Sequence, residues 1–272
     1  EKDGKVFFAL PGVPREMEQM LAASVLPRLR AVAPSQAVVV RRLRCFGAGE
    51  STIAEMIGDA MLRDHNPLVN CTAQTGVITL EIVATTQTVA EAENLAQCQE
   101  TRLRGLLGPL VYGVGEETLA EVVGRQLQRQ GKTLAVAESC TGGLLAKLIT
   151  DVPGASRYFT RGWVTYSNEA KIDELGVPPE LIARHGAVSE EVAQAMARGA
   201  RARAGTDYAI GITGIAGPDG GTDEKPVGLV YVCADFEGQV HTVRQVFPWE
   251  RGYVRLRAAQ TALDILRRGL DR

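Results

Sequence analysis

The stretch Ala-Glu-Ser-Cys-Thr-Gly-Gly at residues 137–143 contains a serine and a cysteine, which can act as nucleophiles, followed by two glycines, which favour a tight turn. An apolar run over residues 133–137 predicts a buried strand before it, and residues 142–149 predict a helix after it. Ser139 is therefore expected where a strand ends and a helix begins, a place where open α/β sheets bind ligands and backbone N–H groups can hold an anion. Two interpretations remain open: Ser139 as a nucleophile, or small polar residues that cap a helix.

A serine nucleophile needs a base, and none of the three histidines is well placed to serve. His65 lies in a middle segment, His185 precedes an expected helix cap, and His241 falls in an expected hairpin. Lys171 is a possible substitute, because a partly desolvated lysine loses affinity for its proton, although its spacing alone favours a solvated surface lysine. Cys140 is a rival nucleophile, but a small buried thiol after a strand is the commoner case.

Two basic residues, Arg251 and Arg255, lie four apart in the first turn of an expected final helix. Two guanidinium groups near a helix amino end suit a phosphate, whereas without further context they are ordinary exposed helix charges. The acidic residues Asp219, Asp223 and Glu224 lack the spacing of a metal loop. We therefore expect no metal and no cofactor.

The elements that must position these residues alternate between strand and helix over residues 113–272, as in a compact α/β domain. We expect strands at 133–137, 162–166 and 208–213, a hairpin of 227–236 with 240–247, and helices at 118–130, 142–151, 189–203 and 250–270. Residues 167–171 and the glycine-rich 214–221 are expected to be loops. If the first three strands are parallel neighbours, the loops that follow them gather with Ser139 at one edge of the sheet.

The segment 34–112 has a different pattern. Strands at 37–46 and 75–84 and helices at 51–62 and 89–107 suggest a small α+β module of the kind used by RNA-binding KH domains. The nucleic-acid clamp G-x-x-G is missing, and the segment carries more acidic than basic residues. We therefore expect a structural or spacer domain that does not contact nucleic acid.

The first segment, residues 1–33, contains too little to close a core. A strand over 5–10, a turn over 11–14 and a helix over 15–29 are expected. We therefore interpret this segment as the tail of a domain whose body is absent, and the whole chain as a fragment of a longer protein.

The composition of the chain narrows the classes of protein to which it can belong. The 272 residues carry a net charge of −2, which argues against a general binder of nucleic acid or anionic membranes. Five scattered cysteines without a C-x-x-C pair exclude a disulfide framework and are typical of a reducing cytoplasm. No apolar run is long enough to span a bilayer.

Four longer motifs carry a resemblance to a known family. They are Ala137 to Gly143 (AESCTGG), Val164 to Lys171 (VTYSNEAK), Gly186 to Ser189 (GAVS) and Gly211 to Pro218 (GITGIAGP). In this order they resemble the C-terminal domain of the CinA family, over about residues 117–270. Leu10 to Met17 (LPGVPREM) resembles the end of the family's N-terminal, molybdopterin-binding-like domain.

The resemblance implies an α/β protein of three parts. A three-layer α/β/α amidohydrolase domain at 113–272 would follow a KH-like α+β domain at 34–112 and a remnant of the N-terminal α/β domain at 1–33. A cytoplasmic homodimer is also expected.

The resemblance further implies a nicotinamide-nucleotide amidohydrolase, which converts NMN and water to nicotinic acid mononucleotide and ammonia in pyridine nucleotide salvage. Ser139 would be the nucleophile and Lys171 its base, with Tyr166 assisting proton transfer and Thr213 facing the substrate or its oxyanion. The remaining substrate contacts would be Thr141, Gly142, Gly143, Asn168, Gly214 and Gly217, with Arg251 or Arg255 on the phosphate. Thr141 would then cap the helix that follows Ser139.

Two other functions are compatible with the same resemblance. The family's association with competence and DNA damage suggests a binding or recruitment protein. An ADP-ribose pyrophosphatase activity belongs to the N-terminal domain, of which this chain retains only the last strand and helix, so we expect no such activity here.

Overall fold

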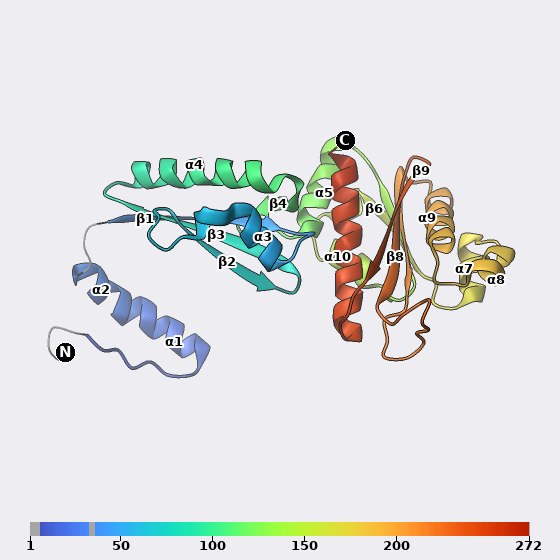
Figure 1. Ribbon diagram of the computed structural model, residues 1–272, viewed down its shortest axis with the longest axis horizontal. Helices are drawn as coiled ribbons and strands as arrows, with labels where there is room; N and C mark the ends of the chain where they lie inside the picture. Colours follow the sequence, from blue (N-terminus) through green and yellow to red (C-terminus); the bar gives the residue numbers. More distant parts are fainter. Residues whose placement is uncertain (1–5, 33–35, 272) are drawn as a thin grey trace.

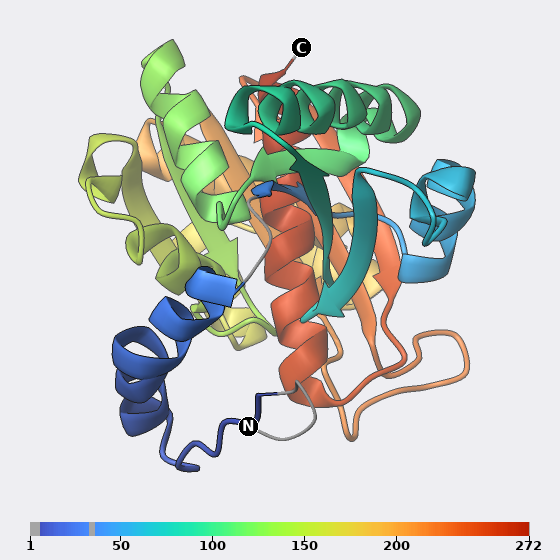
Figure 2. The same ribbon diagram turned by 90° about the vertical axis from the view of Figure 1, so that its left-hand side faces the viewer.

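The computed structural model describes residues 6–32 and 36–271, which form two sheets and an N-terminal helical segment (Figure 1). A four-stranded sheet and a five-stranded sheet lie side by side, and the long helix α10 (Arg251–Leu270) stands at their junction. The N-terminal helices lie to one side of this body, as the turned view shows (Figure 2).

The N-terminal segment is helical from residue 14 onward. Helix α1 (Pro14–Met20) continues through a π-helical turn, Leu21–Val25, into α2 (Leu26–Val32), which confirms the expected helix. The strand expected over 5–10 is wrong for residues 6–10, which have no regular structure, and Lys5 lies outside the described residues. A strand needs a hydrogen-bonding partner, and neither sheet includes this segment.

The KH-like unit is an antiparallel sheet in the order β2-β3-β1-β4, with helices on one face. Its elements are β1 (Ala37–Cys45), α3 (Glu50–Ile57), β2 (Leu68–Gln74), β3 (Val77–Thr86), α4 (Val89–Leu107) and β4 (Val111–Val114). Leu43, Ile53, Leu80, Ile82 and Leu103 are fully buried in its core. Helix α4 starts at a capping box, in which the Thr88 side chain accepts from the Glu91 N–H and the Glu91 carboxylate accepts from the Thr88 N–H.

The apolar patterns of β1 and β3 correctly predicted these two strands, but no strand was predicted at β2. Its sequence, LVNCTAQ, has only two large apolar residues at its start and no sustained alternation. Pairing with β3 makes it a strand, beginning at Leu68 opposite Val83, and a tight turn with Thr75 and Gly76 at positive φ joins the two.

The C-terminal sheet has the order β6-β5-β7-β8-β9, with β5 parallel to both β6 and β7. Its strands are β5 (Leu134–Glu138), β6 (Phe159–Val164), β7 (Tyr208–Gly214), β8 (Leu229–Phe236) and β9 (Gln239–Val246). The first three strands are parallel neighbours, which is the condition under which the loops after them gather, and the expected hairpin of β8 with β9 is confirmed. The loops after β5, β6 and β7 therefore meet at one sheet edge.

Helices cover both faces of this sheet, which confirms the three-layer α/β/α arrangement. On one face lie α5 (Leu119–Gln130), α6 (Leu144–Thr150) and α10, and on the other α9 (Glu190–Ala204), followed outward by α7 (Asn168–Leu175) and α8 (Pro179–His185) (Figure 1). Alternate residues of β5 face the two cores: Leu134 and Val136 pack under α5, α6 and α10, and Ala135 and Ala137 pack against α9. A strand buried on both faces is typical of parallel sheets.

The expected loop at 167–171 is wrong, because Asn168 onward forms α7. Its N-cap is Ser167, whose hydroxyl accepts from the Ala170 N–H at 3.1 Å, and it ends at Gly176 in the left-handed conformation. Strand β6 also ends at Val164, so Tyr166 lies beyond it. A short polar helix has no apolar periodicity to identify it, and only its caps mark it in the sequence.

Helix α10 joins the two sheets through side chains that reach the KH-like unit. Arg257 Nη1 donates to the Gly76 carbonyl at 2.6 Å, and Gln260 donates to the Thr75 carbonyl at 3.1 Å. Arg267 Nη2 reaches the Pro109 carbonyl at 2.7 Å. One helix thus packs in the core of the C-terminal domain and also contacts the neighbouring KH-like unit.

Candidate active site

Ser139 follows directly on β5, at the carboxyl edge of the parallel strands. Its N–H donates to the Ile212 carbonyl of β7 at 3.0 Å. The residue is largely buried and retains 9% of its solvent exposure. The chain then turns sharply through Gly142 (φ 59°) and Gly143 (φ 90°) into α6. Glycine adopts this left-handed backbone without strain, so the two glycines hold the serine at a tight strand-to-helix turn.

The residue before the serine, Glu138, stabilises this turn through hydrogen bonds to its backbone. Glu138 is fully buried, and its carboxylate accepts from the N–H groups of Gly143 at 3.1 Å, Leu145 at 3.0 Å and Ala146 at 2.8 Å. A buried carboxylate at a helix amino end is stabilised by these donors and by the helix dipole. Glu138 is thus the helix cap.

The expected cap, Thr141, is wrong. Its hydroxyl is buried and has no hydrogen-bond partner among the described residues, and the N-cap position of α6 is Gly143. Thr141 precedes the N-cap position by two residues, and the Glu138 carboxylate already accepts from the free N–H groups at the start of the helix.

Lys171 meets Ser139 across the sheet edge. Its Nζ lies 3.1 Å from Ser139 Oγ and also donates to the carbonyls of Thr165 at 2.8 Å, Tyr166 at 3.3 Å and Ser167 at 3.3 Å. The residue is only 1% exposed, so the interpretation as a solvated surface lysine is wrong. Burial lowers the pKa of Lys171 below its ordinary 10.5, which favours the neutral amine that a base requires.

Cys140, the rival nucleophile, lies in a less reactive environment. Burial raises the pKa of its thiol to about 12, so it stays protonated at neutral pH. Its side chain forms no hydrogen bond with Lys171, whereas Ser139 does. The geometry therefore favours Ser139 as the activated group.

Arg251 connects two of the expected site loops. Its Nη1 donates to the Gly217 carbonyl at 2.9 Å and its Nη2 to the Tyr166 hydroxyl at 3.1 Å. Tyr166 itself is 60% exposed. Arg251 also lines an open hollow of about 520 Å³ with Trp249 and Pro218.

Arg255, one helical turn further, is used differently. Its Nε and Nη2 both donate to the Thr141 carbonyl, at 3.2 and 2.7 Å. This two-pronged contact ties α10 to the serine turn. Of the two candidate arginines, Arg251 lines the hollow and Arg255 secures the turn.

The other predicted residues lie around the same edge with distinct surroundings. Thr213 is buried on β7, and its hydroxyl donates to the Ala187 carbonyl at 2.8 Å. Gly214 packs against β8 so closely that an added Cβ would lie 2.6 Å from the Leu229 carbonyl oxygen. Asn168 is the exposed first residue of α7.

Sequence reasoning missed two contributors, Glu138 and Thr165. Thr165 supplies the nearest carbonyl to the lysine, and its own hydroxyl is buried and has no hydrogen-bond partner within residues 6–32 and 36–271. The signal for Glu138 was present, since a carboxylate inside an apolar strand requires a buried partner. Thr165 gave no such signal, because its role depends on its carbonyl.

Among residues 6–32 and 36–271, no group of three or more His, Cys, Asp or Glu side chains is placed to hold a metal ion. Within the same residues no helix is both long and apolar enough to cross a bilayer.

Family models match both domains. The model for the CinA C-terminal domain matches residues 116–270, and that for the damage-inducible protein CinA KH domain matches residues 40–113. The chain belongs to the CinA family.

Relatives extend over nearly the whole chain. A Moorella thermoacetica protein named as a competence-damage inducible protein is 48% identical over 271 residues, and a CinA-like protein of Gemmatimonas aurantiaca is 47% identical over 273. Each match covers 99% of this chain but only 65% and 63% of the respective relative. The chain thus spans slightly less than two thirds of their length.

Solved structures match the C-terminal domain. The competence/damage inducible protein CihA from Agrobacterium tumefaciens is 41% identical, with a TM-score of 0.55, and the match covers 57% of this chain and 94% of that one. A CinA superfamily protein from Klebsiella pneumoniae is 39% identical with the same score, covering 57% and 99%.

Proposed function

We propose that this CinA-family chain is a nicotinamide-nucleotide amidohydrolase, which hydrolyses the amide of NMN to nicotinic acid mononucleotide and ammonia. The observation that carries the proposal is the buried contact between Lys171 Nζ and Ser139 Oγ at 3.1 Å. A serine hydroxyl held against a desolvated amine is one of the arrangements that can activate a serine to attack an amide. The names of the relatives concern competence and damage, so the activity rests on the site's chemistry.

The first step is attack of Ser139 Oγ on the carboxamide carbon as Lys171 accepts the hydroxyl proton. The tetrahedral oxyanion needs donors, and the N–H groups of Cys140 and Thr141 make no hydrogen bond to another described residue. These two N–H groups directly follow the nucleophile and would face the oxyanion. Collapse of the intermediate expels the amine, which takes a proton from Lys171 and leaves as ammonia.

The second step regenerates the serine. Water attacks the nicotinoyl ester on Ser139 as Lys171 accepts a proton from it, and Lys171 then returns this proton to Ser139 Oγ as the acid product departs. Tyr166 would assist proton transfer at the rim, where its hydroxyl already contacts Arg251. Thr213 would shape the site through its bond to the Ala187 carbonyl.

The substrate phosphate is assigned to Arg251. Arg251 lines an open hollow with Trp249 and Pro218, and one of its two contacts is to the exposed Tyr166 hydroxyl, whereas Arg255 holds the Thr141 carbonyl of the serine turn through two nitrogens. A planar guanidinium can hold two phosphate oxygens at once.

Ammonia release from NMN tests the proposal, measured with nicotinamide and NAD as comparison substrates. We expect release from NMN and at least about tenfold less from nicotinamide, because the phosphate contact contributes binding energy. Equal rates on NMN and nicotinamide would contradict the phosphate assignment, and no release from any of the three would contradict the activity.

A further inference from the structure

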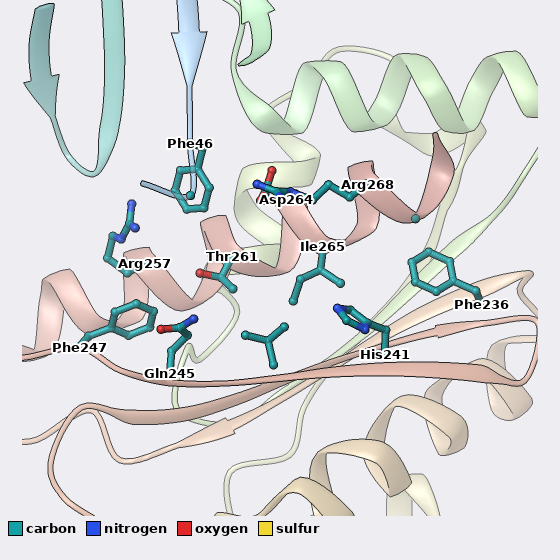
Figure 3. Close-up of a pocket in the computed structure, with 13 residues that line it drawn as sticks. Phe46, Phe236, His241, Gln245, Phe247, Arg257, Thr261, Asp264, Ile265 and Arg268 are labelled. Carbon is teal, nitrogen blue, oxygen red and sulfur yellow. Dashed lines mark hydrogen bonds and ion pairs between the residues drawn. The ribbon is translucent and has the colours of Figure 1, made fainter. Parts of the chain in front are cut away.

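A cleft of about 400 Å³ between α10 and β9 is lined by aromatic and charged side chains (Figure 3). The Arg257 guanidinium carbon lies 4.4 Å from the centre of the Phe46 ring, and Asp264 accepts from Arg268 Nε at 2.8 Å. The aromatic face and the carboxylate of this cleft are thus already in contact with side chains of the same chain.

Lys225 holds the segment that links α8 to α9, the motif Gly186–Ser189, which has no part in the proposed reaction steps. Its Nζ donates to the carbonyl of His185 at 2.5 Å and to that of Val188 at 2.8 Å. The first of these carbonyls belongs to the last residue of α8, where helix carbonyls lack partners within the helix and a cation is favoured. One ammonium group thus bridges the two ends of the link.

The same link is fixed independently on the side of the candidate active site. The Thr213 hydroxyl donates to the Ala187 carbonyl of the link at 2.8 Å. Thr213 directly follows Ile212, whose carbonyl accepts from the Ser139 N–H. Lys225 therefore fastens its own loop to a segment that is already attached to the end of β7.

Lys225 belongs to the loop between β7 and β8, residues 215–228, which is drawn in orange below β8 in Figure 1. The loop is closed at its base, where the Gly228 N–H donates to the Ile215 carbonyl at 2.7 Å. Farther out, the Thr222 N–H donates to the Lys225 carbonyl at 2.8 Å, and the Lys225 N–H donates to the Thr222 hydroxyl at 3.0 Å. The loop is thus a compact Ω-loop whose outer turn carries Lys225.

This loop forms one wall of the hollow that we assign to the substrate phosphate. Ala216, Pro218 and Val227 line the hollow of about 520 Å³ together with Arg251. The two arms of the loop pack closely, since a Cβ added to Gly217 would lie 2.5 Å from Val227 Cγ1. The wall therefore depends on the position of the whole loop.

We propose that Lys225 is a positioning residue that makes the site selective for a substrate carrying a phosphate, an inference that rests on the proposed amidohydrolase function. Its ammonium holds the loop against the link and keeps the wall beside Arg251 formed before the substrate binds. The apparent affinity of a site falls with the fraction of molecules in which that site is formed. The contact between Ser139 and Lys171 does not involve the loop, so turnover of bound substrate should not depend on Lys225.

The test compares kcat and KM for NMN with those for nicotinamide riboside, which lacks the phosphate, in the parent and in Lys225→Met. Methionine keeps the length and the apolar stem of lysine and removes the ammonium. KM for NMN should rise about tenfold, as expected for a lost charged hydrogen bond, with kcat within about twofold of the parent. For nicotinamide riboside, kcat/KM should change by less than about threefold, because this substrate does not use the phosphate hollow. Lys225→Arg keeps the charge and the donors, so its KM for NMN should stay within about threefold of the parent.

Hydrogen exchange, followed by mass spectrometry, tests the hold on the loop without any turnover. The amides of residues 216–227 should exchange at least about tenfold faster in Lys225→Met, because local opening becomes easier. Lys147→Met is the matched control, since Lys147 is an exposed lysine that pairs with Asp151 at the end of α6. It should change neither the exchange of the loop nor the KM for NMN.

Three results with an active parent would overturn the proposal: unchanged exchange of the loop in Lys225→Met, an unchanged KM for NMN, or an equal loss of kcat/KM on both substrates. The last result would show that Lys225 has only a general structural role. Absence of ammonia release from NMN by the parent would instead contradict the amidohydrolase. In that case a raised dissociation constant for NMN in Lys225→Met, measured by calorimetry, would still support the positioning role, and an unchanged one would overturn it.

Discussion

Lys171 Nζ lies 3.1 Å from Ser139 Oγ, although 31 residues separate the two in the chain; Ser139 follows β5, and Lys171 lies in the first turn of α7, the helix after β6. The parallel pairing of β5 with β6 brings them together, because the loops after both strands leave the sheet at the same edge. The lysine is buried and retains contact with three backbone carbonyls. This pair carries the chemistry that we propose.

Lys171→Met should lower kcat for NMN hydrolysis by at least about a hundredfold, the usual contribution of a positioned base. Methionine keeps the length and apolar stem of lysine, so the substrate should still bind. Binding of NMN to the variant, measured by calorimetry, is the control. Loss of binding with the fold intact would make Lys171 a substrate ligand.

The parent enzyme should lose activity as the pH falls through the lowered pKa of Lys171, because protonation removes the base. Stability should follow the same direction. The unfolded lysine keeps its ordinary pKa of 10.5, so between the two pKa values the unfolded state binds more protons and stability rises with pH. In Lys171→Met this rise should be smaller, which denaturant titrations at several pH values would measure.

Glu138→Gln should destabilise the protein by about 1–3 kcal/mol, because one amide oxygen cannot satisfy the three N–H groups that the carboxylate holds. The displaced turn should also lower kcat more than it changes KM. Glu174→Gln, on the exposed side of α7, is the matched control and should change neither quantity. An unchanged melting temperature in Glu138→Gln would show that the cap is not structural.

Substitutions of Arg251 and Arg255 should affect different kinetic constants. Arg251→Gln should raise KM for NMN about tenfold through loss of a charged contact to phosphate, with a smaller effect on kcat. Arg255→Gln should chiefly lower kcat, since it releases the Thr141 carbonyl and the serine turn with it. The reverse pattern would exchange the two roles.

Gly211→Ala should unfold or strongly destabilise the C-terminal domain. A Cβ there would lie 2.4 Å from the Ala193 carbonyl oxygen, because α9 packs directly on β7. Gly105→Ala, inside α4 with open space around it, should instead stabilise by about 1 kcal/mol. Melting temperatures of both variants test the contrast, and a neutral Gly211→Ala would mean that α9 stands further from the sheet.

Much of this architecture could be predicted because long apolar patterns set it. The buried strand before Ser139, the hairpin near the end and the helix α4 all have clear periodicity or caps. Strand β2 and helix α7 escaped prediction because their structure depends on a pairing partner and on caps. The expected strand was wrong over residues 6–10 for the related reason that neither sheet of the described residues supplies a partner strand.

Some features of the candidate site could likewise be predicted from the sequence, and others depended on the fold. Residue types indicated Ser139 and offered Lys171, but only the sheet order and burial could show that the lysine is desolvated beside the serine. Sequence spacing placed Arg251 and Arg255 on one helix face, and the fold then gave them different partners. Roles that depend on backbone carbonyls, such as that of Thr165, leave no trace in residue type.

Turnover of NMN by Ser139→Ala, compared with Cys140→Ala, tests the central claim most directly. We predict a loss of at least about a thousandfold in kcat for Ser139→Ala and a change of less than about tenfold for Cys140→Ala, because only the serine hydroxyl contacts the base. Both variants should keep the parent's melting temperature within a few degrees. Near-normal ammonia release by a folded Ser139→Ala would contradict the assignment of Ser139 as nucleophile.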